Sequence, residues 1–272
     1  MTTFALMSDL HLEFEHGFTH SVKIPEVDVL LLAGDICTPW TTDDLQQRVF
    51  RSFFNEVSKK AKVTYVICGN HEHYFGYFVD THDYYYEEYL KPYSNIKLLN
   101  NQSEFHDSFA IFGSTFWTDL RNGHPEVKWK SQRGMNDFNH IQYSVDRTSL
   151  NGLPKLLPDD IIEENLFSRK KLNDFLLECK EKNVKPIVMT HHALSYELTP
   201  HEYQTDLLSF AYANTGLDNL IYDLDREVIF CYGHMHNRRV SKIGMGTFMN
   251  NARGYLGHEV QSYNYKAKEF LL

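Results

Sequence analysis

The stretch that decides the fold is VTYVICGNHE at residues 63–72. Its apolar, β-branched half predicts a strand buried on both faces, and the glycine and polar residues after it predict a turn at the carboxyl end of that strand. Four further segments repeat this plan: FALMSDLH at 4–11, VDVLLLAGD at 27–35, PIVMTHH at 186–192 and EVIFCYGHMH at 227–236. Ligands of open α/β sheets bind beyond the carboxyl ends of the strands, so we expect these strand ends to meet at one edge.

The polar residues at these strand ends predict a metal site. They are Asp9, His11, Asp35, Asn70, His191, His234 and His236. Imidazole nitrogen and carboxylate oxygen suit divalent Mn, Fe, Ni, Co or Zn. So many ligands exceed one tetrahedral site but fit two metals that share a bridging carboxylate. Each motif alone also fits an ordinary turn or a buried histidine, and it is the joint pattern that favours a metal site.

Helical patterns lie between the strands and complete an α/β chain. We predict one helix that Thr42 caps and that carries a single apolar stripe of Leu45, Val49, Phe53 and Val57, and further helices at 79–90, 159–182 and 217–224. We also predict strands at 96–99, 109–112, 240–243, 246–249 and 267–271. This order favours two packed sheets with helices on the outside. We expect a single domain over residues 1–272, with a long irregular insertion at about 118–158 where the sequence is polar and rich in turn residues.

The composition indicates a globular protein and limits the classes of partner that it can bind. Of 272 residues, 42% are hydrophobic and 23% are charged, which excludes disorder, collagen and coiled coil for most of the chain. The net charge of −9 argues against long nucleic acid as a partner. The four cysteines form no CxxC pair, which predicts free thiols in a cytoplasmic protein. No signal peptide or membrane-length apolar run is present in the sequence, so we expect no membrane partner.

Together, the five motifs resemble the five sequence blocks of the calcineurin-like metallophosphoesterases. The resemblance extends from about residue 4 to about residue 255. It implies a four-layer α/β/β/α sandwich of two mixed sheets flanked by helices, with a dinuclear metal centre. It also implies the ligand sets: Asp9, His11 and His236 for the first metal, Asn70, His191 and His234 for the second, and Asp35 as the bridge.

Three other segments are similar to a bacterial and phage subgroup of predicted phosphohydrolases in that family. They are TFWTD at 115–119, RGMND at 133–137 and NARGY at 251–255. The subgroup often has NPRGY where this chain has NARGY, so Ala252 replaces a proline and the turn should be looser.

The resemblance and the residue chemistry together predict a mechanism. Two metals lower the pKa of a bridging water, and the resulting hydroxide is expected to attack phosphorus in line. Asp35, as the bridging ligand, and His71 are the predicted catalytic residues. His71 follows Asn70 directly, so we expect it to lie near the metals without binding them and to protonate the leaving oxygen. The alternative for His71 is a structural histidine.

Further residues are weaker candidates for supporting roles. Glu72, His73 and His192 are candidates for orienting the ligands, although a structural role fits the two histidines equally well. Arg133 and Arg253 can grip phosphate oxygens through the guanidinium fork, and a salt bridge is the alternative for each. Asn136 and Tyr255 are further candidates for contacts with the substrate.

The leading interpretation is a phosphoesterase that carries two divalent metal ions, with Mn²⁺ expected first and Fe, Ni, Co or Zn compatible with the ligands. The expected substrate is a small phosphomonoester or phosphodiester, such as a nucleotide or a cyclic nucleotide. The alternatives are a protein phosphatase and a catalytically silent scaffold or binding protein of the same fold. The sequence leaves the oligomeric state open.

Overall fold

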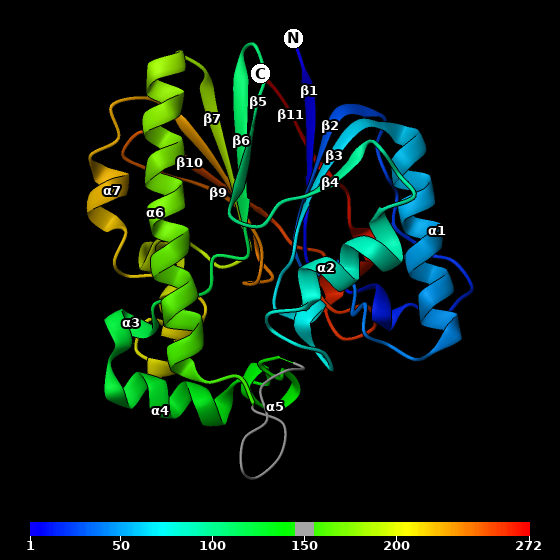
Figure 1. Ribbon diagram of the computed structural model, residues 1–272, viewed down its shortest axis with the longest axis horizontal. Coiled ribbons are helices and arrows are strands. Elements are labelled where there is room, and N and C mark those ends of the chain that lie inside the picture. The colour runs from blue at the N-terminus through cyan, green and yellow to red at the C-terminus, as the bar shows by residue number, and fades with distance from the viewer. Residues whose placement is uncertain (145–154) are drawn as a thin grey trace.

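The computed structural model describes residues 1–144 and 155–272 and has two central sheets between layers of helices (Figure 1). The first sheet has the strand order β11-β1-β2-β3-β4. Its strands are β1 (Thr3–Met7), β2 (Val27–Ala33), β3 (Ala61–Ile67), β4 (Ile96–Leu98) and β11 (Lys268–Leu271). Strands β1 to β4 run parallel and β11 pairs antiparallel with β1, so this sheet is mixed.

The second sheet has the strand order β5-β6-β7-β8-β10-β9. Its strands are β5 (Gln102–Phe105), β6 (Phe109–Ser114), β7 (Lys185–Thr190), β8 (Val228–Tyr232), β9 (Arg238–Ile243) and β10 (Gly246–Asn251). The four inner strands run parallel, and the edge strands β5 and β9 are antiparallel to their neighbours. The sequence analysis missed β5, because QSEF is a polar edge strand without a buried apolar run.

Helices cover the outer face of each sheet, which confirms the predicted four-layer sandwich (Figure 1). The first sheet carries α1 (Asp44–Lys60) and α2 (Thr81–Tyr85), and the second carries α6 (Pro158–Lys182) and α7 (Asp218–Tyr222). Leu31 of β2 and Ile187 of β7 share the core between the sheets. Phe53 of α1 and Phe175 of α6 belong to the two outer cores. The apolar runs of β2 and β7 are continuous because these strands are buried on both faces.

Helix α1 begins one residue later than predicted. Asp43 rather than Thr42 is the N-cap, because its side chain accepts a hydrogen bond from the Leu45 N–H at 2.8 Å. The predicted stripe is otherwise present, since Val49, Phe53 and Val57 are buried. Single-turn segments complete the chain. Those at 3₁₀ pitch span Leu12–Phe14, His71–His73, Tyr196–Leu198, His201–Tyr203, Leu207–Ala211 and Val260–Asn264, and a π turn spans Tyr86–Leu90.

The stretch 118–158 differs from the irregular insertion that we expected. Its described part contains three helices, α3 (Leu120–Gly123), α4 (Pro125–Gly134) and α5 (Asp137–His140), while residues 145–154 lie outside the described residues. The polar sequence of α4 gave no clear apolar stripe, because Val127 is its only buried large apolar residue. Across residues 1–144 and 155–272, none of the helices combines the length and apolarity needed to cross a bilayer.

Candidate metal centre

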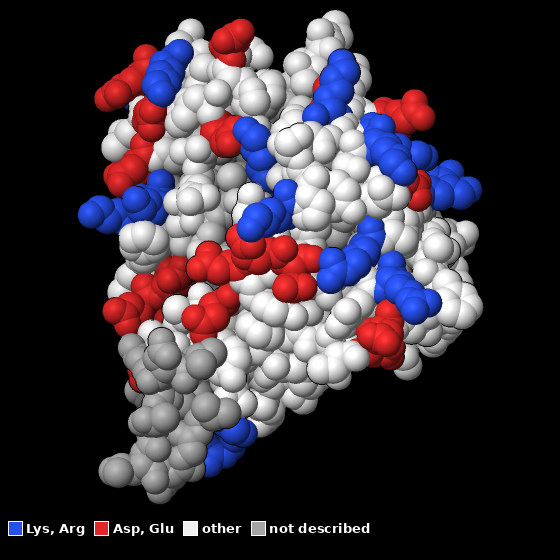
Figure 2. Space-filling model, turned by 45° about the vertical axis from the view of Figure 1, so that its right-hand side comes forward, with Lys and Arg blue, Asp and Glu red and all other residues white. Residues whose placement is uncertain are grey.

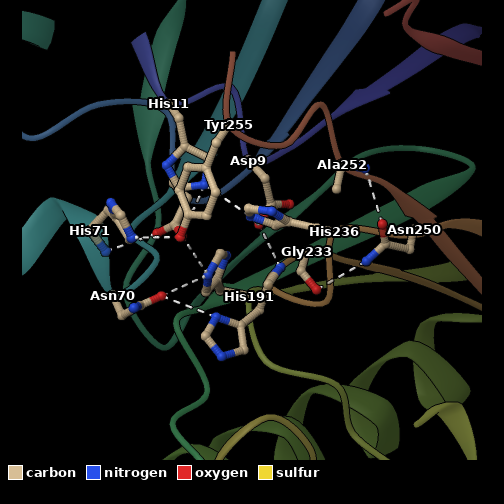
Figure 3. A network of polar contacts seen from close by, with 12 residues as sticks. Asp9, His11, Asn70, His71, His191, Gly233, His236, Asn250, Ala252 and Tyr255 are labelled. Carbon is tan, nitrogen blue, oxygen red and sulfur yellow. Dashed lines mark hydrogen bonds and ion pairs between the residues drawn. The ribbon is translucent and has the colours of Figure 1, made fainter. Parts of the chain in front are cut away.

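The carboxyl ends of strands from both sheets meet at one place, as the sequence predicted. Asp9 and His11 follow β1, Asp35 follows β2, Asn70 and His71 follow β3, His191 follows β7, and His234 and His236 follow β8. Backbone hydrogen bonds tie neighbouring loops together, since the Asp9 N–H donates to Gly34 O and the His11 N–H donates to Asp35 O, both at 3.0 Å. Figure 3 shows the side chains converging from these separate segments.

The backbone at this place is strained. Five of the predicted ligands adopt left-handed φ values: Asp9 (50°), His11 (46°), Asp35 (53°), His234 (64°) and His236 (43°). A residue with a side chain seldom takes this conformation, and such strain persists only where the surrounding structure fixes it. The turns therefore aim the predicted ligand side chains into the centre at a cost to local stability.

Asp9, His11 and His236 form the first group of possible ligands. One ligand atom of each lies within 4.8 Å of the others. His11 Nε2 lies 3.0 Å from His236 Nε2, which in turn lies 3.5 Å from Asp9 Oδ1. The second oxygen of Asp9 is buried and finds no hydrogen-bond partner among the described residues. Converging ring nitrogens and a carboxylate with one unsatisfied oxygen fit a divalent cation.

Asp35, His191 and His234 form the second group, and Asn70 completes it. His191 Nε2 lies 3.2 Å from Asp35 Oδ2, and Asn70 Oδ1 lies 3.1 Å from both His191 Nε2 and His234 Nδ1. The other ring nitrogen of His234 is buried without a partner in the described part of the chain. Burial acts to lower the pKa of His191, but the Asp35 carboxylate outweighs it and raises the pKa to about 10. The group therefore favours positive charge at this position.

Asp35 lies between the two groups. Its Oδ2 is 3.2 Å from His191 Nε2 on one side and 3.8 Å from His11 Nε2 on the other. A carboxylate placed in this way can contact ions on both sides, which is the position that a bridging ligand requires.

Acceptors outside the centre set the orientation of three imidazoles. The Nδ1–H of His11 donates to Glu13 at 3.1 Å, that of His236 donates to Glu259 at 2.7 Å, and that of His191 donates to Ala33 O at 3.0 Å. Each acceptor fixes a proton on Nδ1 and leaves Nε2 facing the centre as a possible ligand atom. Sequence reasoning missed both glutamates. For Glu13, the alternating spacing of Asp9, His11 and Glu13 was an available signal, while Glu259 gave none.

Asp137 orients the amide of Asn70, and sequence reasoning missed this role as well. Asp137 Oδ1 accepts hydrogen bonds from Asn70 Nδ2 and from the Tyr74 hydroxyl, both at 2.8 Å. The amide nitrogen is thereby turned outward and Asn70 Oδ1 faces the histidines. Asp137 belongs to the RGMND segment at 133–137, but nothing in that segment predicted that its carboxylate would contact Asn70.

Glu72 forms hydrogen bonds with backbone groups around the centre and not with the side chain of a predicted ligand. Its carboxylate accepts hydrogen bonds from the backbone N–H groups of Gly69 (2.6 Å), Asp35 (2.9 Å) and Ile36 (2.7 Å). Burial and the nearby Asp35 carboxylate raise the pKa of Glu72. The orienting role predicted for Glu72 thus acts by joining the loops after β2 and β3.

The other two candidates for orienting roles, His73 and His192, are both fully buried but lie in different surroundings. His192 Nδ1 lies 3.3 Å from Thr115 O, and its ring packs 4.4 Å from the ring of His234. Burial lowers the pKa of His192 to about 3, so its ring is neutral. His73 makes no hydrogen bond to a predicted ligand within the described residues and packs beside His82.

His71 faces a cavity next to the centre. Its backbone N–H donates to Asp35 Oδ1 at 2.8 Å, its Nδ1 lies 3.0 Å from Glu13 Oε1, and its Nε2 lies 3.4 Å from the Tyr255 hydroxyl. Burial acts to lower the pKa of His71, but Asp35 and Glu13 outweigh it and raise the pKa to about 9. The ring lies close to the predicted ligands, but it does not join the contacts that Asn70 Oδ1 makes with His191 and His234. This position suits a proton donor that does not itself bind an ion.

The cavity beside the centre has a volume of about 500 Å³. Its floor includes Asp35, Asn70, His71, His234 and His236, and its walls include Tyr74, Asn136, Thr199, Pro200, Tyr203, Asp206, Ser209, Tyr212 and Tyr255. The structure therefore places Asn136 and Tyr255 where a substrate can touch them.

The two arginines are not brought to the cavity. Arg253 is only 2% exposed, and its guanidinium donates to Glu15 Oε1 at 2.8 Å, to Ser21 Oγ at 2.8 Å and to Leu10 O at 3.1 Å. Arg133 is exposed and lies 4.4 Å above the ring of Trp129. Arg253 therefore forms the salt bridge that was its alternative role, with Glu15 as the partner. Neither arginine lines the cavity, so the structure does not support the expected contact with phosphate.

Comparisons with known proteins agree with this architecture. A family model described as calcineurin-like phosphoesterase matches residues 2–238. The chain is 26% identical over 282 residues to "Uncharacterized protein L509" of Acanthamoeba polyphaga mimivirus, covering 95% of this chain and 92% of that protein. Among solved structures it is similar to phosphopantetheinyl hydrolase (PptH) from Mycobacterium tuberculosis, with a TM-score of 0.66 and 14% identity over 99% of this chain and 95% of that one. At that identity the likeness shows a shared fold.

Proposed function

The chain belongs to the calcineurin-like phosphoesterase family of metal-dependent phosphoester hydrolases, and on that premise we propose that it hydrolyses small phosphate esters at a dinuclear metal centre. The observation that carries this proposal is the placement of Asp35 between two groups of potential ligand atoms. Each group contains one buried atom, Asp9 Oδ2 or His234 Nε2, without a hydrogen-bond partner among the described residues. Asp9, His11 and His236 would hold one ion, and Asn70, His191 and His234 the other. Mn²⁺ is the first choice, and Fe, Ni, Co and Zn also suit these ligands.

When bound, the two ions would make water nucleophilic near neutral pH and offset charge on the phosphoryl oxygens. His71, which lines the cavity beside the centre, would supply the proton for the leaving oxygen. Its Nδ1 contact with Glu13 fixes the orientation of the imidazole, and the charges of the Asp35 and Glu13 carboxylates raise its pKa. A positioned general acid of this kind contributes about 10²–10⁴-fold to the rate.

The cavity walls favour a substrate with one phosphoryl group and an uncharged remainder. No lysine or arginine among the described residues lines the cavity. Within residues 1–144 and 155–272, the charged side chain that lines the cavity away from the centre is Asp206, which is paired with Lys130 at 2.7 Å. Thr199, Ser209 and Tyr212 offer neutral hydrogen-bonding and aromatic contacts instead. A polyphosphate would find no cation for its further charges among the described lining residues, whereas a nucleoside monophosphate or a cyclic nucleotide satisfies both requirements.

The molecular surface also argues against long nucleic acid. On the face shown in Figure 2, a band of Asp and Glu side chains interrupts the Lys and Arg side chains. A continuous basic stripe is the usual footprint of a phosphate backbone. Together with the net charge of −9, this pattern supports a small substrate. The four cysteines are free and buried, which is consistent with the proposed cytoplasmic location.

A panel assay with Mn²⁺ tests the proposal. It compares nitrophenyl phosphate, bis-nitrophenyl phosphate, nucleoside monophosphates, cyclic nucleotides, a phosphopeptide and a phosphopantetheinyl compound. The phosphopantetheinyl compound is included because a protein of similar fold is a phosphopantetheinyl hydrolase. We expect turnover of a small ester, and Asp35→Asn should abolish that turnover and lower the metal content. Preference for the phosphopeptide would indicate a protein phosphatase. Failure to hydrolyse any substrate with both metals bound would indicate a binding protein.

A further inference from the structure

A further cluster of side chains that could hold a metal ion lies within residues 68–82, separate from the residues predicted to bind the two ions of the centre. Cys68 follows β3, His73 ends the 3₁₀ turn that carries His71, and His82 lies in the first turn of α2. One ligand atom of each residue lies within 4.8 Å of the others. A zinc ion lies about 2.3 Å from a thiolate sulfur and about 2.0–2.1 Å from an imidazole nitrogen, so small side-chain shifts would let these atoms share one ion.

The histidines of this cluster are unsatisfied. His73 is fully buried, and within the described residues its ring nitrogens make no hydrogen bond of regular geometry, although the ring interacts with the backbone of Tyr77. His82 Nε2 is also buried without a partner in that part of the chain. Buried polar groups in native proteins are almost always paired, so two such imidazoles beside a thiol need an explanation that a packing role alone does not supply.

The surroundings suit a structural metal rather than a catalytic one. The rings of Trp117 and Phe78 lie 5.6 Å and 5.8 Å from the ring of His73 and cover it with apolar surface. Two imidazoles and one thiolate form a softer donor set than that of the dinuclear centre, which holds no sulfur among its predicted ligands. Thiolate and imidazole together select zinc over manganese.

We propose that Cys68, His73 and His82 form a third metal site that binds Zn²⁺. The ion would link the end of β3 to the start of α2 and so brace the segment that carries Asn70 and His71. His73 would then serve this site instead of orienting a ligand of the dinuclear centre. The proposal does not rest on the proposed phosphoesterase activity, since none of the three residues touches the cavity beside the dinuclear centre.

Cobalt titration of the metal-free full-length chain tests the site, because sulfur bound to Co²⁺ gives a charge-transfer band in the near ultraviolet and nitrogen or oxygen ligands do not. We expect about three Co²⁺ per chain with this band present. Zn²⁺ should displace the cobalt responsible for the band. Cys68→Ser should abolish the band and remove about one equivalent, and the ions remaining in the dinuclear centre would show that the variant is folded.

Cys37→Ser is the matched control, since Cys37 is a buried thiol nearby whose Sγ lies 3.7 Å from the Tyr85 hydroxyl. This variant should keep the band. Absence of the band in the wild-type titration would overturn the proposal, and this test does not depend on whether Cys68→Ser folds. Persistence of the band in Cys68→Ser would also overturn it. Saturation at about one equivalent with the band present would support this site and contradict the dinuclear centre, which separates the two proposals.

Discussion

Glu13 Oε1 lies 3.0 Å from Nδ1 of His71, and the same oxygen lies 3.1 Å from Nδ1 of His11. One carboxylate therefore orients a predicted metal ligand and the predicted proton donor together. Burial acts to raise the pKa of Glu13, but its hydrogen bonds to the two histidines lower it to about 2, so the carboxylate is ionised. We therefore predict that Glu13 is a positioning residue that couples the proposed metal centre to the proposed acid.

Replacing Glu13 by glutamine should weaken both functions at once. We expect kcat to fall by roughly 10–100-fold and the affinity for the first metal to fall as well, because both imidazoles lose the acceptor that fixes their orientation. Metal titration and steady-state kinetics measure the two effects. Glu26→Gln, at an exposed glutamate, is the control. Wild-type metal affinity and kcat in Glu13→Gln would contradict the coupling.

The His71→Ala variant should keep its metals and lose its proton donor. On an alkyl phosphate we expect kcat to fall by about 10²–10⁴-fold, whereas nitrophenyl phosphate should be affected much less because its leaving group needs little protonation. Metal analysis of the variant and of the exposed control His16→Ala should give equal contents. Equal losses on both substrates would show that His71 is not the acid.

The Asp137→Ala variant should lose affinity for the second metal selectively. Without Asp137, Asn70 Nδ2 keeps only its longer hydrogen bond to the Tyr74 hydroxyl at 3.1 Å, so the amide can turn its oxygen away from His191 and His234 more easily. We expect the affinity to fall by roughly 10–100-fold. Isothermal titration with Mn²⁺ resolves the two binding steps, with the exposed Asp107→Ala as control. An unchanged second step would mean that Asn70 does not depend on Asp137.

Substitution of Arg253 should affect stability rather than substrate binding. Arg253→Met leaves the buried Glu15 carboxylate without its ion pair, which should lower the free energy of unfolding by about 3–5 kcal/mol. Denaturant unfolding measures this loss. Arg133→Met, at an exposed side chain, should change stability by less than about 0.5 kcal/mol. A large rise in KM for Arg253→Met under conditions where it is folded would restore a direct role in phosphate binding.

Removal of the metals should destabilise the chain and abolish activity together. The centre gathers Asp9 and Asp35 with several imidazoles and strained turns, so ions that bind only the folded state add to its stability. Dialysis against a chelator should lower Tm, and added Mn²⁺ should restore Tm and turnover in a concentration-dependent manner. A Tm that does not respond to Mn²⁺ would argue against metal binding at these residues.

The sequence alone determined the layers of the fold and the set of residues that gather at the centre. Buried parallel strands have continuous apolar runs, and their carboxyl ends meet at one edge, so local patterns such as VTYVICGNHE identify both the strand and the residues beyond it. The same reasoning does not identify elements without an apolar pattern. It therefore missed β5 and α4.

Only the tertiary structure decided which side chains support that centre. Asp137 meets Asn70 across 67 residues, Glu259 meets His236 across 23, and Arg253 meets Glu15 across 238. No periodicity links such positions, because each contact depends on how separate loops pack after the sheets have formed. The same packing decides that Arg253 is buried in an ion pair while Tyr255, two residues later, lines the cavity.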